Sequence, residues 1–406
     1  MAKTIAIIAA LDTKGPEAAL LRDTIRHRGH VPLTIDVGVL GKPFYQAEIT
    51  ADAVARAGGD DLIALRTSEN KARAMTAMTR GAATVAAQLH AAGRIDGIVG
   101  LGGTAGTTIG TSAMRALPIG FPKLIVSTVA AGDTRPYIGT KDIAMMYSVV
   151  DIAGLNGISG PILANAAGAI VGMVETESPQ LPRRPLLAAS MFGNTTRCVD
   201  LARATLEASG YEVLVFHATG AGGQTMESLI ADGFIEGVFD ITTTEWADEL
   251  TGGVFAAGPH RLEAAARAGV PQVVAPGCLD MANFGGPETV PERYRTRTLY
   301  EWNPSVTLMR TNVEENAHLG RILAEKVSMS TGPVTVFLPL RGVSQLDSPG
   351  GDFWWPEADV ALYGAIRQHL RPDIPVVELD LNINDAAFAA AAAARLLEYV
   401  GPRATA

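Results

Sequence analysis

Cysteine is nearly absent from this chain: two occur among 406 residues, Cys198 and Cys278. Two cysteines give no disulfide framework of the kind that stabilises small secreted domains. A reducing compartment is the default for such a sequence, and we expect the protein to be cytoplasmic.

Charged residues are also scarce. They make up 18% of the chain, and the acidic ones outnumber the basic ones to give a net charge of −9. The densest basic group, Arg293, Arg295 and Arg297, lies among acidic residues. Phosphate backbones are held by clustered lysine and arginine, which this sequence does not offer. We therefore expect no nucleic-acid partner.

Long, purely apolar runs are missing as well. The apolar run near the N-terminus meets Asp12 and Lys14 after about eight residues, too few for a signal peptide or a membrane span. The longest stretch of low charge, residues 152–174, contains Asn156, Pro161 and many small residues. That composition favours a helix packed inside protein over one in lipid. We expect no membrane association.

Short β-branched runs that alternate with helical patterns are abundant. Hydrophobic residues make up 48% of the chain, which is typical of a large α/β core. The alternation predicts parallel strands joined by right-handed helical crossovers. Prolines at 179, 182 and 185 mark a linker. We predict an α/β protein with two Rossmann-like domains, mostly parallel sheets flanked by helices: a nucleotide-binding domain (1–178), a Pro-rich linker (179–185) and a C-terminal domain (186–406).

The predicted strand ends of the first half are rich in glycine, hydroxyl groups and charge. The most telling stretch is GIVGLGGTAGTT, residues 97–108, where a buried strand runs into glycines and a helix start. Such a turn presents backbone N–H groups and hydroxyls to an anion. Because ligands bind beyond the carboxyl ends of parallel strands, three loops should converge on one site. Its candidate residues are Asp12, Lys14, Gly102, Gly103, Thr104, Gly106, Thr107, Ser127, Thr128, Gly132, Asp133 and Thr134.

The two common nucleotide fingerprints do not fit this stretch. No Walker sequence GxxxxGK[ST] occurs. Residues 100–105 match GxGxxA, but the strand that ends at Ser127 lacks the ribose-binding acid, which disfavours a hydride-transfer enzyme. A noncanonical nucleotide or phosphate site remains, with Lys14 for phosphate oxygens and Asp12 or Asp133 for Mg²⁺ or ribose. The alternative is that the glycines only permit a tight turn and close helix packing.

Four strand-end residues of the second half are candidates for catalysis: His217, Glu245, Asp280 and Arg341. A base, two acids and an anion-binding guanidinium are parts of an active site. Each has a structural alternative, such as a hydrogen-bonded strand-end histidine or a first-turn acid that complements a helix dipole. Cys278 has no activating base nearby in the sequence and is interpreted as an inert, buried thiol. No HxxxH or CxxC spacing is present, and no metal site is predicted.

Eight collinear strings across essentially the whole chain resemble one known family. They are LDTKG (11–15), GLGGTAGTT (100–108), VSTVAAGDTRPYIGTKDIAMMYSVVDIAGLN (126–156), FHATGAGG (216–223), ITTTEWADEL (241–250), APGCLDMANFG (275–285), VTLMRTN (306–312) and LPLRGVS (338–344). The family comprises bacterial, fungal and plant proteins similar to the N-terminal ATP-binding region of the tomato protein that confers resistance to tomato mosaic virus. Two positions depart from its pattern: Asn194, where an apolar residue is expected, and Ala131, where a serine is expected.

This resemblance implies an ATP-binding protein of two α/β halves that forms a homodimer. ATP, accompanied by Mg²⁺, would be held by the glycine and hydroxyl loops of the first half. The plant protein continues into a barrel domain similar to a phosphoenolpyruvate-hydrolase-type enzyme, which implies a barrel-type partner protein for this chain. We predict an ATP-binding enzyme or enzyme subunit whose second half binds a small anionic metabolite. The alternatives are a nucleotide-independent hydrolase or lyase of a carbonyl substrate and a regulatory nucleotide-binding subunit of the partner.

Overall fold

The computed structural model of the chain describes residues 2–68, 70–177 and 184–401. The chain divides into two compact units, Met1–Gln180 and Leu181–Ala406, and each is described by itself. Residues 179–183 of the predicted linker lie outside the described residues. Within the described ranges, no helix combines the length and the apolar content needed to cross a membrane.

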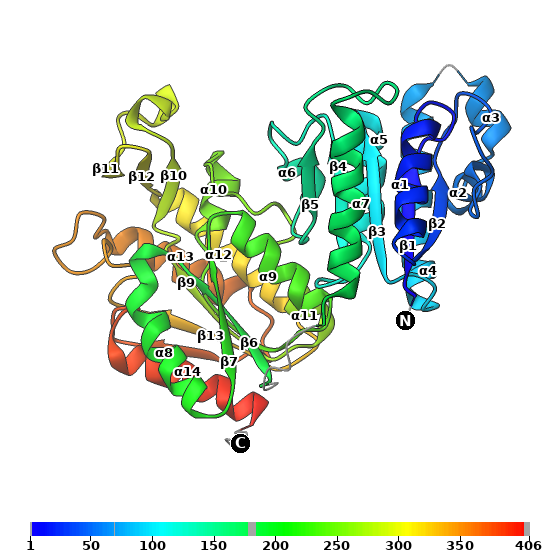
Figure 1. Cartoon of the computed structure of the whole chain (residues 1–406). Coiled ribbons are helices and arrows are strands. Elements are labelled where there is room, and N and C mark those ends of the chain that lie inside the picture. Colours follow the sequence, from blue (N-terminus) through cyan, green and yellow to red (C-terminus); the bar gives the residue numbers. More distant parts are fainter. Residues whose placement is uncertain (1, 69, 178–183, 402–406) are drawn as a thin grey trace. The chain divides into compact units, whose positions relative to one another are not determined.

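The first unit is built on a five-stranded sheet in which every pairing is parallel, in the order β2-β1-β3-β4-β5 (Figure 1). The strands are β1 Thr4–Ala9, β2 Val31–Asp36, β3 Gly97–Gly102, β4 Lys123–Ser127 and β5 Ala144–Tyr147. The helices are α1 Gly15–His27, α2 Ala51–Ala57, α3 Leu62–Thr67, α4 Lys71–Ala91, α5 Thr104–Arg115, α6 Arg135–Ile138 and α7 Ser159–Glu175.

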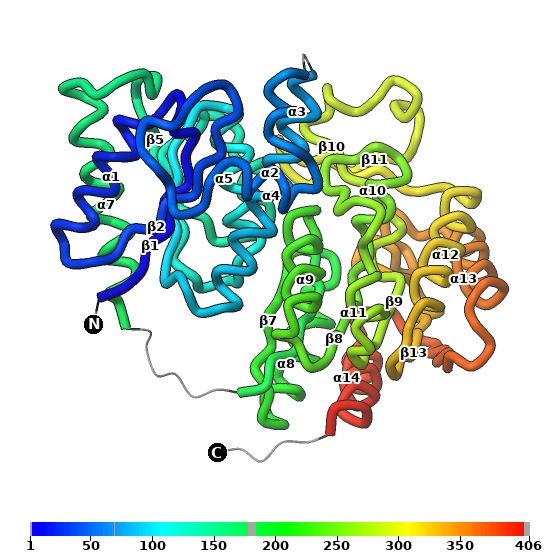
Figure 2. Tube along the Cα trace, turned by 90° about the vertical axis from the view of Figure 1, so that its right-hand side faces the viewer, coloured from blue at the N-terminus to red at the C-terminus, as the bar shows by residue number. Residues whose placement is uncertain are grey.

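Helices cover both faces of this sheet, which explains why the sequences of its strands are continuous apolar runs. Along β1, Ile5 and Ile7 point to one face, where they pack with α1 and α7, which lie side by side (Figures 1 and 2). Ile8 points to the other face, against α4 and α5. Burying each such side chain contributes roughly 1.5–3 kcal/mol before the entropy of ordering is subtracted. The low-charge stretch 152–174 supplies α7, whose Leu163 and Ile170 lie in this core.

The second unit contains a six-stranded parallel sheet in the order β14-β13-β9-β8-β6-β7. Its strands are β6 Leu186–Met191, β7 Glu212–His217, β8 Ile235–Thr242, β9 Gln272–Gly277, β13 Val334–Pro339 and β14 Val376–Leu379. Helices α8 Thr196–Ala208 and α14 Ala386–Val400 cover one face. The other face packs with α9 Ala221–Ala231, α11 Ala264–Ala268, α12 Val313–Ser328 and α13 Pro356–His369.

The two sheets share one strand order. Numbered within each unit, both run 2-1-3-4-5, and the second adds a sixth strand at its edge. The predicted architecture of two α/β domains with mostly parallel sheets flanked by helices is therefore confirmed. An antiparallel three-stranded sheet, formed by β10 Met281–Phe284, β12 Val306–Arg310 and β11 Leu299–Asn303, was not predicted. This small sheet is inserted in the chain between β9 and α12. The remaining helix of the unit, α10 Glu245–Thr251, follows β8.

Candidate functional site

A cavity lies at the carboxyl edge of the first sheet, between the ends of β1 and β3. These strands are neighbours, but α1 and α5, the helices that follow them, pack on opposite faces. The two loops therefore diverge, which is where doubly wound sheets bind ligands. The cavity, called here the β1–β3 pocket, measures about 340 Å³. Its wall is formed by Ala10, Asp12, Thr13, Lys14, Val37, Gly38, Val39, Leu40, Met75, Leu101, Gly102, Gly103, Thr104, Ala105, Gly106 and Ile109.

Six of the twelve predicted ligand-binding residues line this pocket: Asp12, Lys14, Gly102, Gly103, Thr104 and Gly106. Helix α5 begins at the pocket wall, with Gly103 as its N-cap and no cap hydrogen bond from a side chain of the described residues. The first N–H groups of that turn, at the positive end of the helix dipole, are available to an anion. Residues of the stretch 97–108 thus form one wall of the pocket, and the anion site predicted there stays a prediction.

The glycines of the pocket serve two different purposes. A Cβ on Gly102 would lie 2.7 Å from the Cα of Gly106, so these two glycines let β3 and α5 pack closely. A Cβ on Gly103 would meet only the Oγ1 of Thr128, at 3.7 Å, which is an ordinary contact. Gly103 is therefore not required by packing, and its missing side chain leaves space at the start of α5.

The other predicted residues of the first half lie elsewhere. Thr107 and Ser127 are fully buried and their hydroxyl oxygens are 2.6 Å apart, so they bond to each other and join α5 to β4. Asp133 forms a two-pronged ion pair with Arg135 in an exposed loop. The residues that do not line the pocket are Thr107, Ser127, Thr128, Gly132, Asp133 and Thr134. The third loop that lines the pocket is the one after β2. The loop after β4 reaches the start of α5 through Thr128, whose N–H donates to the carbonyl of Gly102 (3.3 Å).

Asp12 and Lys14 are held in the pocket wall by backbone groups. The Oδ2 of Asp12 accepts hydrogen bonds from the N–H groups of Leu40 (2.6 Å) and Gly41 (2.9 Å). Its Oδ1 is buried and accepts no hydrogen bond from the described residues. The Nζ of Lys14 donates to the carbonyl of Ile152. Asp12 is thus held by the loop after β2, and Lys14 by the segment after β5.

Asp36 is a residue that the sequence prediction missed. It ends β2, it is 4% exposed, and its Oδ1 accepts from the N–H groups of Leu11 (3.0 Å) and Gly38 (2.9 Å). Burial raises the pKa of this carboxyl from its ordinary value. Asp36 ties the loop after β1 to the loop after β2 and so shapes the pocket. The sequence signal that could have identified Asp36 is an acidic residue at the end of a predicted strand.

The four predicted catalytic residues of the second half are not brought together. Glu245 is 1% exposed; its Oε1 accepts from the N–H groups of Gly220 (2.8 Å) and Gly223 (3.1 Å), and its Oε2 accepts from the Nε of Arg261 (2.6 Å). Burial raises the pKa of this carboxyl. Both oxygens are engaged, so the structure replaces the predicted catalytic role of Glu245 with a structural one.

Arg261 is the centre of this buried group, called here the Arg261 cluster. Its guanidinium contacts Asp240 at two points (both 2.6 Å), Glu245 (2.6 Å) and Glu227 (3.1 Å). The arginine side chain is 1% exposed. The cluster joins β8, α9 and α10 to the loop before α11. Arg261 lies 16 to 34 positions from these acids in the sequence, so no local motif predicts that they pair.

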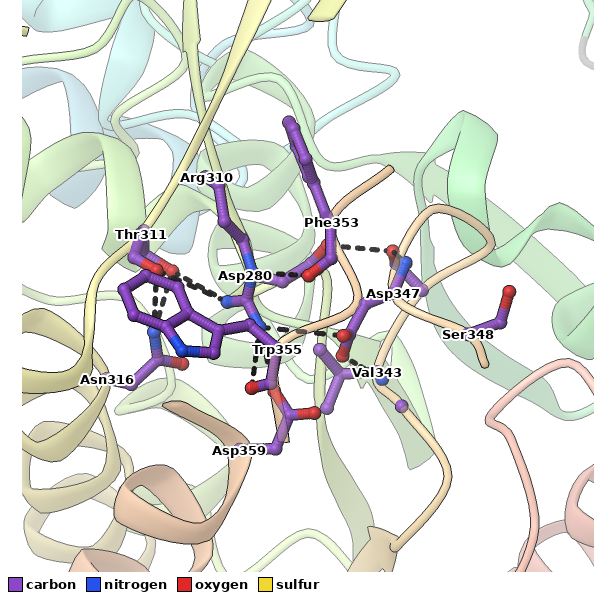
Figure 3. Close-up of polar contacts among 12 residues, drawn as sticks. Asp280, Arg310, Thr311, Asn316, Val343, Asp347, Ser348, Phe353, Trp355 and Asp359 are labelled. Atoms are coloured by element: carbon purple, nitrogen blue, oxygen red, sulfur yellow. Dashed lines mark hydrogen bonds and ion pairs between the residues drawn. The ribbon is translucent and has the colours of Figure 1, made fainter. Parts of the chain in front are cut away.

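Asp280 belongs to a second buried group, the Arg310 cluster, shown in Figure 3. The Nη2 of Arg310 contacts Asp359 (2.9 Å) and Asp347 (3.5 Å), while Asp280 accepts from the hydroxyl of Ser344 (2.8 Å). Burial, and next the charge of Asp347, raise the pKa of Asp280 to about 8 and that of Asp359 to about 7. The cluster fastens the antiparallel sheet to the main sheet, and Asp280, predicted as a catalytic acid, is fully buried within it.

His217 and Arg341 are exposed. The imidazole of His217 lies 5.4 Å from the ring of Phe192, and partial burial lowers its pKa from the ordinary value. The guanidinium of Arg341 has no hydrogen bond or ion pair within the part of the chain that the structure describes. Cys278 is fully buried, and burial raises the pKa of its thiol, in agreement with the interpretation of an inert thiol. No group of three metal-ligating side chains occurs among the described residues.

Comparison with family models assigns both units. Residues 3–179 match the N-terminal domain, and residues 184–400 the C-terminal domain, of the Uncharacterised protein family (UPF0261). The chain belongs to the UPF0261 family. A UPF0261 protein of Clostridium tetani (strain Massachusetts / E88) is 49% identical over 402 residues, which are 98% of this chain and 100% of that protein.

A plant relative supports the resemblance noted in the sequence. The ToMV resistance protein Tm-1(GCR237) of Solanum lycopersicum is 45% identical over 310 residues, which are 74% of this chain and 41% of the tomato protein. Among solved structures, UDP-N-acetylglucosamine 2-epimerase from Rickettsia bellii is similar at a TM-score of 0.23 and 9% sequence identity. The matched region covers 67% of this UPF0261 chain and 78% of the epimerase chain. A score that low carries no argument about function.

Proposed function

We propose that this UPF0261 protein binds ATP in the β1–β3 pocket of its first unit. The observation that carries the proposal is the place of the GLGGTAG loop. It begins α5 at the point of the sheet where the loops after β1 and β3 diverge, and it lines a cavity with Asp12 and Lys14. Doubly wound sheets bind nucleotides at this point.

The residues of the pocket fit the parts of a nucleotide. The first-turn N–H groups of α5 and the ammonium of Lys14 suit phosphate oxygens. The carboxylate of Asp12, a residue of the pocket wall, suits a ribose hydroxyl or Mg²⁺, which prefers oxygen ligands. Met75, Val39 and Ile109 offer an apolar wall for a base. The volume of about 340 Å³ lies within the range of small-molecule sites.

The wider proposal is an enzyme, or an enzyme subunit, that acts on a small anionic metabolite in its second unit. We place it in the cytoplasm as a homodimer, with a barrel-type protein as a partner. The second candidate is a nucleotide-independent hydrolase or lyase. It has one observation in its favour: His217 is exposed and its lowered pKa leaves it neutral and able to accept a proton at neutral pH. Glu245 and Asp280 do not support it, because both are buried in other bonds.

Gly103→Val tests the proposed ATP site. Isothermal titration calorimetry of the wild-type protein with ATP and Mg²⁺ should show saturable heat. In the variant that heat should disappear, because two methyl groups would stand where the phosphates approach α5. The circular dichroism spectrum should stay unchanged, since a Cβ at this position meets nothing closer than 3.7 Å.

Gly172→Val is the matched control. This glycine is exposed in α7, where an added Cβ would have nothing within 4 Å. The control should bind ATP as the wild type does. Wild-type protein that gives no heat, or a Gly103→Val variant that binds normally, would rule out the β1–β3 pocket as the ATP site.

A further inference from the structure

The longest of the family strings, residues 126–156, supplies no residue to the wall of the β1–β3 pocket. Its last part lies in the connection between β5 and α7, residues 148–158, called here the β5–α7 connection. Two side chains from the beginning of the chain reach this connection: Lys14, which lines the pocket, and Glu17, in the first turn of α1. The connection is thus tied to residues that belong to the pocket or adjoin it.

The β5–α7 connection is held against α1 by two polar bonds and one buried side chain. The Nζ of Lys14 donates to the carbonyl of Ile152. The Oε1 of Glu17 accepts from the N–H of Gly154 (2.6 Å). The side chain of Ile152 is 2% exposed and packs in the core that α1 and α7 share. We call this arrangement the closed state of the connection.

Packing contributes little to the rest of the connection. Residues 153–158 are all exposed, and even the apolar side chain of Leu155 is 48% exposed. The hydroxyl of Ser159, at the start of α7, donates to the carbonyl of Gly154 (3.2 Å) and accepts from the N–H of Asn156 (3.0 Å), so these bonds shape the turn from within. The two bonds to the start of α1 therefore carry much of what keeps the connection closed.

The closed state contains two unfavourable features. Val149 has a φ of +64°, in a tight turn where the N–H of Val150 donates to the carbonyl of Ser148 (2.7 Å). Positive φ is strained for a β-branched residue. Glu17 is fully buried, and its Oε2 accepts no hydrogen bond from the described residues, which is costly for a carboxylate. Movement of the connection away from α1 would relieve both, because Val149 could leave positive φ and water could reach Glu17.

We propose that the β5–α7 connection is a switch that ATP binding in the β1–β3 pocket opens. Ile152 packs on the face of the sheet that α1 and α7 cover, whereas α5 packs on the other face. A Lys14 ammonium that binds phosphate oxygens at the start of α5 therefore leaves the carbonyl of Ile152. The connection then loses one of its two polar bonds to α1, and relief at Val149 and Glu17 favours the open state. This inference rests on the proposed function, since it assigns a regulatory output to the ATP site.

Lys14→Met tests the hold on the connection without any nucleotide. Hydrogen–deuterium exchange read by mass spectrometry should show residues 149–158 exchanging about tenfold faster than in the wild type, because a charge-assisted bond has been removed. Lys42→Met is the matched control: Lys42 is exposed in the loop after β2 and is not part of the pocket wall, so exchange should stay as in the wild type. Equal exchange at 149–158 in Lys14→Met and in the wild type would overturn the inference whether or not the protein binds ATP.

ATP with Mg²⁺ is the second probe in the same experiment. In the wild type it should slow exchange at residues 103–107 and speed exchange at 149–158, and in Gly103→Val it should do neither. Slower exchange at 103–107 without faster exchange at 149–158 would overturn the switch and leave the ATP site standing. No change in either segment of the wild type would overturn the ATP site and the switch together.

Gly154→Ala measures the coupling from the side of the connection. Gly154 has a φ of +85°, and an added Cβ would have nothing within 4 Å, so alanine penalises the closed backbone without a clash. Calorimetry should show ATP binding about fivefold more tightly, because the closed state that competes for Lys14 is weakened. Gly157→Ala is the control, since Gly157 has equally open surroundings and no positive φ. Equal ATP affinity in the two variants would contradict the coupling.

Discussion

Arg261→Met is expected to destabilise the second unit by about 3–5 kcal/mol, because removing one partner of a buried ion pair leaves uncompensated charge. Arg261 is 1% exposed and contacts the carboxylates of Asp240, Glu245 and Glu227. Without the guanidinium, these acids would face one another in the interior and would ionise only at high cost. The variant should therefore also become less stable as the pH rises.

Urea unfolding followed by tryptophan fluorescence measures this effect in one unit alone. All four tryptophans of the chain, at 246, 302, 354 and 355, belong to the second unit. Arg267→Met is the control: its side chain is 60% exposed, and its partner Glu263 keeps a second ion pair, with Lys326. An ion pair made by so exposed an arginine contributes about 0–1 kcal/mol. Equal unfolding midpoints for the two variants would contradict a structural role for the Arg261 cluster.

The stability of the second unit is expected to fall as the pH rises from about 5 to 8. Burial raises the pKa of Asp248 to about 7, of Asp359 to about 7 and of Asp280 to about 8. In the unfolded chain such carboxyls ionise near pH 4. Between these limits the folded state holds more protons than the unfolded state, so a rise in pH favours unfolding. Each retained proton contributes up to about 1.4 kcal/mol per pH unit to the slope.

Asp280→Asn isolates one of these groups. The amide oxygen can still accept from the hydroxyl of Ser344, but the side chain can no longer ionise. The slope of the unfolding free energy against pH should become shallower by up to about 1.4 kcal/mol per pH unit, the contribution of one proton. Asp352→Asn, at an exposed position of the loop between β13 and α13, should leave the slope unchanged. A wild-type protein whose stability rises across this pH range would contradict the protonated Arg310 cluster.

The sequence predicted the elements that obey local rules. The apolar runs that predict strands at 4–11 and 186–192 form β1 Thr4–Ala9 and β6 Leu186–Met191, and the apolar start of 97–108 forms β3 Gly97–Gly102. The low-charge stretch supplies a helix packed in the core. The order of small, charged and glycine residues after β1 and β3 also identified two loops of the β1–β3 pocket. These predictions succeeded because buried parallel strands and glycine turns leave their pattern in consecutive residues.

The sequence could not show how distant polar groups pair. Thr107 and Ser127 both follow the pattern of ligand-binding hydroxyls, but the register of β3 and β4 pairs Gly102 with Ser127 and turns the two hydroxyls to each other. Glu245 and Asp280 were predicted as catalytic acids at strand ends, because the groups that bond them, Arg261 and Ser344, are 16 and 64 positions away. The antiparallel insertion that covers Asp280 was missed because its strands are only four or five residues long.

The central claim is that the β1–β3 pocket holds ATP. A crystal structure of the protein grown with Mg²⁺ and a non-hydrolysable ATP analogue tests it most directly. We predict phosphate density at the first turn of α5, within hydrogen-bond reach of the N–H groups of Thr104 to Gly106, with the ammonium of Lys14 turned from the carbonyl of Ile152 toward the phosphates. Nucleotide density elsewhere in the protein, or a β1–β3 pocket that stays free of nucleotide at saturating analogue, would contradict the account.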